Sequence, residues 1–144
     1  MQINIKLLNE FAKMPTRGSE QAAGWDLYAA TASDFSISPH ETLKVGTGIA
    51  IAIPEGYFGA IFARSGLATK QGIRPANAVG VIDSDYRGEL IVALHNDTNQ
   101  TQYLNAGDRI AQLVVVPYAL AEFDEVDELD NTIRGDGGFG STGV

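Results

Sequence analysis

The 144-residue chain is long enough for one domain with a substantial core, and its 44% hydrophobic and 19% charged residues are typical of a globular protein. It contains no cysteine, which excludes disulfides, thiolate metal sites and cysteine nucleophiles. No apolar run approaches the ~20 residues that span a bilayer, and the N-terminus lacks the basic-then-apolar pattern of a signal peptide. We therefore expect a cytoplasmic protein with no membrane partner.

The net charge of −8 is concentrated in one stretch of the chain. Six acidic residues and no basic residue lie between Glu122 and Asp130, so the rest of the chain is nearly neutral. A surface that binds nucleic acid needs clustered Lys and Arg, and the sequence has no such block, so we expect no nucleic-acid partner. We interpret the acidic run as a solvated surface; the alternative is that it keeps the following segment extended.

Short apolar runs separated by glycines and turn residues predict an all-β protein. Residues 3–7 alternate apolar with polar, and residues 49–53 form an apolar run closed by Pro54-Glu55-Gly56. Four further strands are predicted at residues 58–63, 79–82, 90–94 and 110–116. Many short strands with intervening turns favour a barrel or a jelly-roll-like sandwich.

The only clear helix signal lies at residues 65–72, between a serine that can cap a helix and a glycine that can end it. Because a helix start presents unpaired N–H groups, Arg64, Ser65 and Gly66 are candidates for binding phosphate. The alternative is an ordinary helix cap beside a surface arginine.

Residues 77–90 contain two apolar runs around a polar turn, which is the pattern of a β-hairpin. Asp83 and Asp85 project to the same side if the strand continues, so that one of them is a candidate base or metal contact. The alternative is a solvated turn, in which aspartates are common.

Residues 107–113 lead into a strongly apolar strand. Asp108 and Arg109 are interpreted as a structural ion pair. Gln112 is a polar residue within this strand, and it requires a hydrogen-bonding partner if it faces inward. The alternative is a glutamine at an exposed edge.

The C-terminal residues 134–144 hold five glycines and a single large apolar residue, Phe139. We therefore divide the chain into one β-rich domain, residues 1–133, and a flexible tail. Glycine N–H groups can converge on phosphate, Arg134, Ser141 and Thr142 add donors, and Phe139 can stack on a planar base. The alternative is a plain linker. The two histidines, His40 and His95, have no partner at metal or triad spacing and are taken as incidental.

Taken together, these segments resemble the five ordered motifs of the trimeric deoxyuridine triphosphate nucleotidohydrolases (dUTPases). The matching segments are residues 23–27, 64–68, 80–88, 107–113 and 134–143, so the resemblance covers most of the chain. One departure is Trp25, where the family more often has tyrosine or phenylalanine. This change keeps an aromatic ring and leaves the following Asp26 in place.

The resemblance implies a jelly-roll-like (β-clip) dUTPase fold with one short helix and a Gly-rich C-terminal tail. It implies a homotrimer whose active sites are shared between subunits and closed by the tail. The implied reaction is hydrolysis of dUTP to dUMP and pyrophosphate, with Mg²⁺ held mainly by the triphosphate and water attacking the α-phosphorus. Such an enzyme limits uracil incorporation into DNA and supplies dUMP for dTMP synthesis.

The same resemblance assigns roles within the domain. Asp83 holds and activates the attacking water. The residues that hold the phosphate chain are Arg64, Ser65, Gly66 and Gln112. The residues that face the nucleoside are Asn77 and the backbone of Val81, Ile82 and Asp83 at the uracil edge, with Tyr86 under the deoxyribose.

The tail is implied to be the active-site lid, and its substrate-binding residues are Arg134, Gly138, Phe139, Gly140, Ser141 and Thr142. Asp26 is implied to support the water network around the metal without binding it directly.

Two other functions remain open at this point. A deoxycytidine triphosphate deaminase shares the fold and the phosphate-binding serine and arginine, but it places a glutamate base in the pocket, where this chain has the segment around Asp83. A regulator that binds dUTP without turnover is the second alternative, and the complete tail argues against it.

Overall fold

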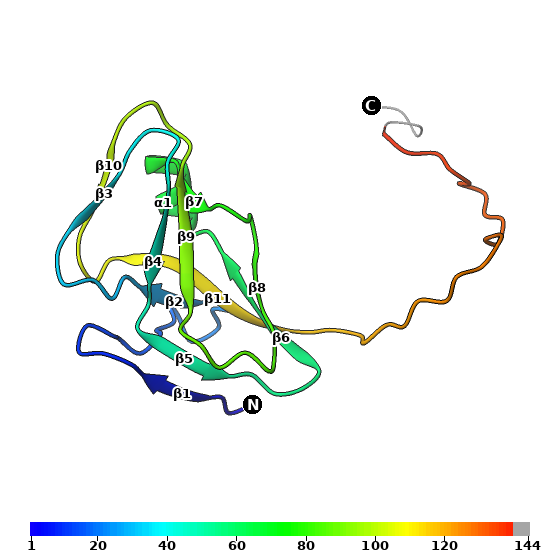
Figure 1. Ribbon diagram of the computed structural model, residues 1–144, viewed down its shortest axis with the longest axis horizontal. Coiled ribbons are helices and arrows are strands. Elements are labelled where there is room, and N and C mark those ends of the chain that lie inside the picture. Colours follow the sequence, from blue (N-terminus) through cyan, green and yellow to red (C-terminus); the bar gives the residue numbers. More distant parts are fainter. Residues whose placement is uncertain (140–144) are drawn as a thin grey trace.

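The computed structural model describes residues 1–139 (Figure 1), which contain eleven strands and one helix. The strands are β1 (Asn4–Leu7), β2 (Trp25–Tyr28), β3 (Phe35–Ile37), β4 (Thr42–Gly46), β5 (Ile49–Ala52), β6 (Tyr57–Phe62), β7 (Ile73–Pro75), β8 (Gly80–Ile82), β9 (Ile91–Asn96), β10 (Gln102–Leu104) and β11 (Arg109–Pro117). The helix, α1 (Ser65–Gln71), lies between β6 and β7. The prediction of an all-β protein with one short helix is confirmed.

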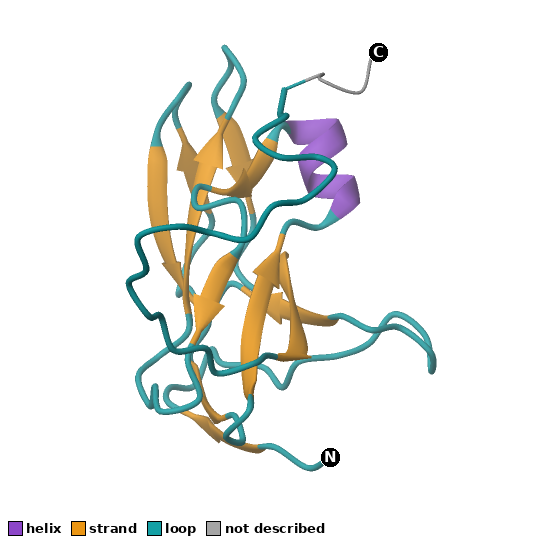
Figure 2. Ribbon diagram, turned by 90° about the vertical axis from the view of Figure 1, so that its right-hand side faces the viewer, coloured by secondary structure: helices purple, strands orange, loops and turns teal. Residues whose placement is uncertain are grey.

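The strands pair antiparallel in small sheets, with a four-stranded sheet of order β2-β11-β6-β8 and a three-stranded sheet of order β4-β9-β7. Two further pairs, β1-β5 and β10-β3, complete the strand pairing in the described chain (Figure 2). The core between them contains fully buried side chains such as Ile37, Ile73, Leu90, Leu94 and Ile110. This packing fixes where the strand ends, and hence the candidate site residues, lie.

Each apolar run in the sequence lies in or beside a strand, but the predicted hairpin at residues 77–90 is wrong. β8 pairs with β6, and β9 pairs with β4 and β7 in a different sheet. The segment between β8 and β9 therefore crosses from one sheet to the other. The sequence resembles a hairpin because two apolar runs lie on either side of a polar turn. The sequence pattern does not reveal that each strand pairs with other strands of the chain.

The helix ends as predicted and starts differently. Gly72 has a left-handed backbone (φ 64°) and donates its N–H to the Ala68 carbonyl, so this glycine is the predicted stop. The N-cap position is Arg64 and not the expected Ser65, which already lies inside the helix. The Ser65 carbonyl accepts a hydrogen bond from the Thr69 hydroxyl at 2.7 Å.

After β11 the chain leaves the body and runs outward (Figure 1). We call residues 118–139 the arm; it has no helix or strand, and it carries the acidic run on exposed residues. Its apolar side chains are also exposed, among them Leu120, Phe123, Leu129 and Ile133. Gly140, Ser141 and Thr142 lie outside the described residues. Among the described residues, no helix is long and apolar enough to cross a membrane.

Asn96, at the end of β9, has a fully buried side chain that joins three segments. Its amide nitrogen lies 3.0 Å from the Ile37 carbonyl, 3.1 Å from that of Ser38 and 2.8 Å from that of Gln100. Its amide oxygen accepts from the N–H and hydroxyl of Thr98. The side chain therefore ties the end of β9 to the end of β3 and to the segment that connects β9 with β10.

We predict that Asn96→Asp lowers the free energy of unfolding by about 3 kcal/mol, because a buried carboxylate would replace the amide donors in front of carbonyl oxygens. Urea unfolding at pH 7 and fixed protein concentration measures this loss. Asn131→Asp, in the exposed arm, makes the same chemical change without burial and is the control. Equal stability of the two variants would contradict the role assigned to Asn96.

Candidate active site

An aspartate and two arginines form the centre of a pocket beside the start of α1. The Arg64 Nε donates to the Asp26 Oδ1 at 2.7 Å, and the Arg109 Nη1 donates to the Asp26 Oδ2 at 3.3 Å. The Asp26 side chain is only 13% exposed, whereas the two arginine side chains are 27% and 50% exposed. Asp26 therefore holds both guanidinium groups at the rim of the pocket. We call this site the arginine pocket.

The register of β11 assembles the arginine pocket. Gln112 on β11 lies opposite Asp26 on β2 and opposite Phe62 at the end of β6. Arg64 follows Phe62 by two residues, and Arg109 lies three residues before Gln112. The first, second and fourth sequence motifs thus meet at one place because β11 pairs with both β2 and β6.

Gln112 faces the arginine pocket and has a hydrogen-bonding partner, as an inward-facing glutamine requires. Its Nε2 donates to the Ala63 carbonyl at 2.9 Å, and its side chain is half-buried. A Cβ at Gly24 would overlap the Gln112 side-chain oxygen, so a glycine is required where β2 approaches this amide. This contact between Gly24 and Gln112 was not predicted from the sequence.

The expected ion pair between Asp108 and Arg109 is wrong. The Asp108 Oδ2 accepts from the backbone and side-chain nitrogens of Asn105, at 2.7 and 3.2 Å, inside a tight turn. Arg109 is instead paired with Asp26, across the β2–β11 ladder. The sequence reading thus missed Arg109 as a pocket residue because neighbouring opposite charges suggested a local pair.

The charges of the arginine pocket suit an anion. Two guanidinium groups face one carboxylate, which leaves one net positive charge among the lining residues. Ser65 and Gly66 add the first N–H groups of α1, which have no partner within the helix. The cavity measures about 430 Å³ and is large enough for a chain of phosphate groups.

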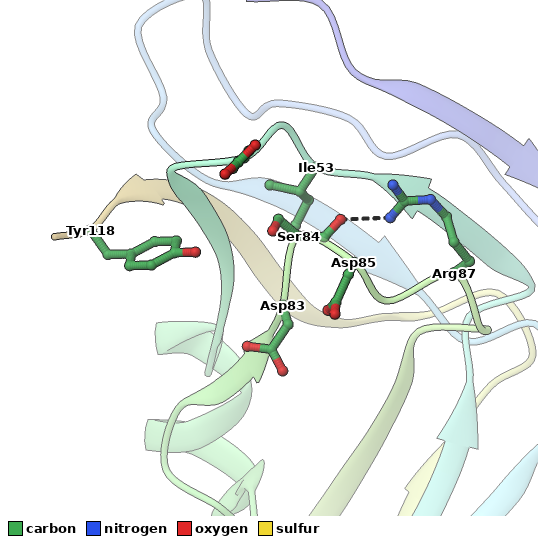
Figure 3. Close-up of a pocket in the computed structure, with 7 residues that line it drawn as sticks. Ile53, Asp83, Ser84, Asp85, Arg87 and Tyr118 are labelled. Carbon is green, nitrogen blue, oxygen red and sulfur yellow. Dashed lines mark hydrogen bonds between the residues drawn. The ribbon is translucent and has the colours of Figure 1, made fainter. Parts of the chain in front are cut away.

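A second pocket lies beyond β8 and is lined by carboxylates. Figure 3 shows Asp83 and Asp85 on the segment after β8, with Arg87 and Tyr118 nearby. Together with Glu55 these residues line a cavity of about 580 Å³, which we call the carboxylate pocket. Asp83 and Asp85 line the same cavity and are both exposed, so either carboxylate is accessible to solvent.

Other predicted nucleoside-binding residues flank β8. Asn77 lies in the turn before β8, and its side-chain amide lies close to Gly80. A Cβ added to Gly80 would be 3.3 Å from the amide nitrogen of Asn77. Val81 is 61% exposed although it is a strand residue. The half-exposed Tyr86 follows Asp83 by three residues and donates its hydroxyl to the Glu89 carbonyl at 3.0 Å.

Within one chain the predicted site residues fall into separate groups. The arginine pocket contains the predicted phosphate-binding residues, and none of them lines the carboxylate pocket that contains Asp83. Arg134, Gly138 and Phe139 lie at the exposed end of the arm and line neither pocket. The described chain alone therefore does not bring the predicted phosphate-binding side chains and Asp83 into one cavity.

The described residues contain no group of three His, Cys, Asp or Glu side chains arranged to hold a metal ion. The one carboxylate of the arginine pocket, Asp26, already accepts from two arginines. These residues therefore do not fit a resident metal ion bound directly by the protein.

The fold and these pockets define a class of protein: an all-β protein with a positively charged pocket suited to an anion and a separate carboxylate pocket. Comparison with known proteins narrows the class. The dUTPase family model matches residues 10–143. The chain belongs to the dUTPase family, and the resemblance seen in the five motifs is confirmed.

Relatives match along almost the whole chain. A deoxyuridine 5'-triphosphate nucleotidohydrolase of Desulfitobacterium hafniense is 50% identical over 133 residues, covering 92% of this chain and 88% of the relative. One from Corynebacterium glutamicum is 49% identical over 142 residues, covering 98% and 94%. The match to the family model, which ends at residue 143, includes the C-terminal tail.

Solved structures confirm the dUTPase fold. The Staphylococcus bacteriophage 80alpha dUTPase with dUPNHPP has a TM-score of 0.91 and 31% identity, covering 99% of both chains. A mutant dUTPase of phage phi11 of S. aureus has a TM-score of 0.82 and 29% identity, covering 91% of this chain and 100% of the phage chain. That phage protein is described with a coordinated structural Mg(II) ion.

We predict that Asp26→Asn lowers the free energy of unfolding by about 1–3 kcal/mol, because an amide cannot accept charge-assisted hydrogen bonds from both guanidinium groups. Urea unfolding at pH 7 and fixed protein concentration measures the change. Asp130→Asn, in the exposed arm, is the matched control. A change within about 0.5 kcal/mol, the usual range for surface substitutions, would show that Asp26 does not hold the pocket together.

Proposed function

We propose that this chain hydrolyses dUTP to dUMP and pyrophosphate by attack of water on the α-phosphorus. The observation that carries the proposal is the arginine pocket, in which three motifs of the dUTPase family meet around Asp26. Membership of the family supports the substrate, and the net positive charge of the pocket supports a polyphosphate. Phosphoryl transfer requires mainly positioning and charge stabilisation, which these groups can supply.

In this proposal Arg64, Ser65, Gly66 and Gln112 hold the phosphate chain. The Asp26 carboxylate accepts from the Nε of Arg64, and the Arg109 carbonyl accepts from its Nη1 at 3.4 Å, so Nη2 is the nitrogen that we propose for phosphate oxygens. A Cβ at Gly66 would meet no atom of the described chain, so packing within the chain does not require this glycine. Close approach of a phosphate to the backbone gives a reason for it.

Asp83 is proposed to hold and polarise the attacking water. Its carboxylate is exposed and, unlike that of Asp26, accepts no hydrogen bond from an arginine of the described chain. It can therefore accept from a water molecule. A carboxylate is a weak base, so it acts mainly by orienting the water. The proton then passes to solvent as the bond to the leaving pyrophosphate breaks.

We propose that the complete site forms in a homotrimer. The separation of the arginine pocket from the carboxylate pocket supports this, because the phosphate-binding side chains and Asp83 must face one substrate. Contact between the arginine pocket of one subunit and the carboxylate pocket of another would supply both. The outward course of the arm supports a lid that reaches a neighbouring subunit (Figure 1).

The uracil-binding part of the proposal uses β8. This strand is at the edge of its sheet, because it pairs with β6 on one side and has no described strand on the other. The backbone of Val81, Ile82 and Asp83 therefore offers donors and acceptors to a planar base, and Asn77 lies beside it. A cytosine edge would leave such groups unpaired, at a cost of about 1–3 kcal/mol each. Tyr86 is proposed to pack under the deoxyribose.

The lid and the metal complete the proposal. Arg134, Gly138, Phe139, Gly140, Ser141 and Thr142 are proposed to close over the bound nucleotide. Mg²⁺ is proposed to arrive bound to the triphosphate and to neutralise part of its charge, with Asp26 acting only indirectly through water. A cytoplasmic enzyme of this kind would limit uracil incorporation into DNA and supply dUMP for dTMP synthesis.

The decisive measurement is pyrophosphate release from dUTP, UTP, dCTP and TTP, with and without Mg²⁺. We expect Mg²⁺-dependent release from dUTP, and a loss of about 100-fold or more in Asp83→Asn because the water is no longer oriented. The variant should still bind dUTP, since the phosphate-binding groups are intact. Asp85→Asn alters the other carboxylate of the same pocket and is the matched control.

Three results would contradict the proposal. Ammonia release from dCTP with dUTP left intact would identify a deaminase. Binding of dUTP without turnover by the wild type would identify a regulator. Turnover by Asp83→Asn within about tenfold of wild type (~1.4 kcal/mol) would show that Asp83 is not the residue that orients the water.

Shared sites predict that two inactive variants restore each other's activity. Arg64→Ala and Asp83→Asn subunits, dissociated, mixed and reassembled, should form trimers in which some sites combine an intact Arg64 with an intact Asp83. Pyrophosphate release from dUTP should then exceed that of either variant alone. Each variant reassembled with itself is the control, and a mixture as inactive as both controls would place the whole site within one subunit.

A further inference from the structure

Tyr86 is held against the main chain by two separate contacts. Its hydroxyl donates to the Glu89 carbonyl at 3.0 Å. A Cβ at Gly88 would overlap that hydroxyl and lie 2.6 Å from the ring carbon Cζ, so the ring rests directly on the Gly88 backbone. The orientation of Tyr86 therefore depends on where the backbone of residues 88 and 89 lies.

The Glu89 side chain ties this backbone to another part of the domain. Its Oε1 accepts from the Gly48 N–H at 2.7 Å, in the bend between β4 and β5. A Cβ at Gly46 would lie 2.5 Å from the same oxygen, so the carboxylate fits closely into this bend. Among the described residues Glu89 forms no ion pair, and the hydrogen bond that its carboxylate accepts comes from a backbone N–H.

The next residue strengthens the same attachment. Leu90 is fully buried, its N–H donates to the Ile49 carbonyl at 2.8 Å, and its carbonyl accepts from the N–H and hydroxyl of Thr47. Residues 89 and 90 are thus fixed to the bend on both sides. Arg87, the residue after Tyr86, donates to the carbonyls of Ser84 and Tyr86, at 2.6 and 2.9 Å; the Ser84 bond is drawn in Figure 3.

We propose that Glu89 is a positioning residue for sugar selection: its carboxylate, held by Gly48, fixes the carbonyl that orients the Tyr86 ring. A side chain that refuses a 2′-hydroxyl by crowding does so only if it cannot move aside. Contacts that fix the ring raise the cost of such movement. The inference rests on the proposed function, in which Tyr86 packs under the deoxyribose.

The test compares kcat/KM for dUTP and UTP in two variants of Glu89. Glu89→Ala removes the acceptor and should lower the dUTP:UTP ratio by about tenfold, the factor that corresponds to ~1.4 kcal/mol. The change should arise mainly from a lower KM for UTP. Glu89→Gln keeps an oxygen acceptor for Gly48 and should retain most of the ratio.

The matched control is Glu41→Ala. Glu41 precedes β4, at the end opposite the Gly46 bend, and its Oε2 accepts from the Ser38 N–H at 2.8 Å. That backbone donor lowers the pKa of the Glu41 carboxyl, so this residue makes the same kind of bond away from Tyr86. Loss of selectivity in Glu89→Ala with selectivity retained in Glu41→Ala supports the proposal. An equal ratio in both variants overturns it.

A double-mutant cycle distinguishes the proposed action of Glu89 through Tyr86 from a purely structural role of Glu89. Tyr86→Phe removes the hydroxyl that Glu89 orients, so its effect on the ratio should not add to that of Glu89→Ala. Full additivity overturns the proposal. If Glu89→Ala does not fold, Gly88→Ala decides instead: the added methyl group displaces the ring, and an unchanged ratio overturns the proposal.

Failure of this inference is distinguishable from failure of the proposed function. Absence of dUTP hydrolysis in the wild type contradicts the function itself. Hydrolysis with an unchanged dUTP:UTP ratio in Tyr86→Ala removes Tyr86 as the sugar-selecting residue, and the role of Glu89 with it. A narrowed ratio in Tyr86→Ala but not in Glu89→Ala contradicts only the role of Glu89.

Discussion

The pairing of β11 with two strands at once is the constraint on which the site depends. A shift by one residue would turn every side chain of β11 to the other face of the sheet. Gln112 would then no longer face Gly24 and Ala63, and Ile110 would leave the core. The buried positions of β11 therefore fix the polar ones, and packing of the core also sets the geometry of the arginine pocket.

Under the proposed function, the distribution of carboxylates gives a reason for dividing the site between two cavities of the chain. Asp26 already occupies one end of Arg64 and the nearer side of Arg109. A second carboxylate beside these arginines would neutralise the net positive charge of the arginine pocket. Keeping Asp83 in a different pocket avoids this pairing in the free subunit. Assembly and substrate together would bring the opposite charges close.

Local patterns in the sequence predicted local structure well. The alternation in β1 and the left-handed Gly72 both follow from a few neighbouring residues. The same local patterns did not predict which strands pair over a long distance. Residues 77–90 have the pattern of a hairpin, although their strands belong to different sheets. The roles of Asn96 and Glu89 could not be predicted, because their partners are distant backbone groups. The motif resemblance identified the candidate site where local chemistry left alternatives open.

Four glycines of the motifs illustrate two different physical situations. Gly24 and Gly88 lack a side chain because another side chain of the same subunit, Gln112 or Tyr86, occupies that space. Gly66 and Gly138 have open space where a Cβ would stand. Packing within the subunit accounts for the first kind and leaves the second unexplained. Gly66 lies in the arginine pocket, where the proposed close approach of a phosphate to the backbone gives a reason for it.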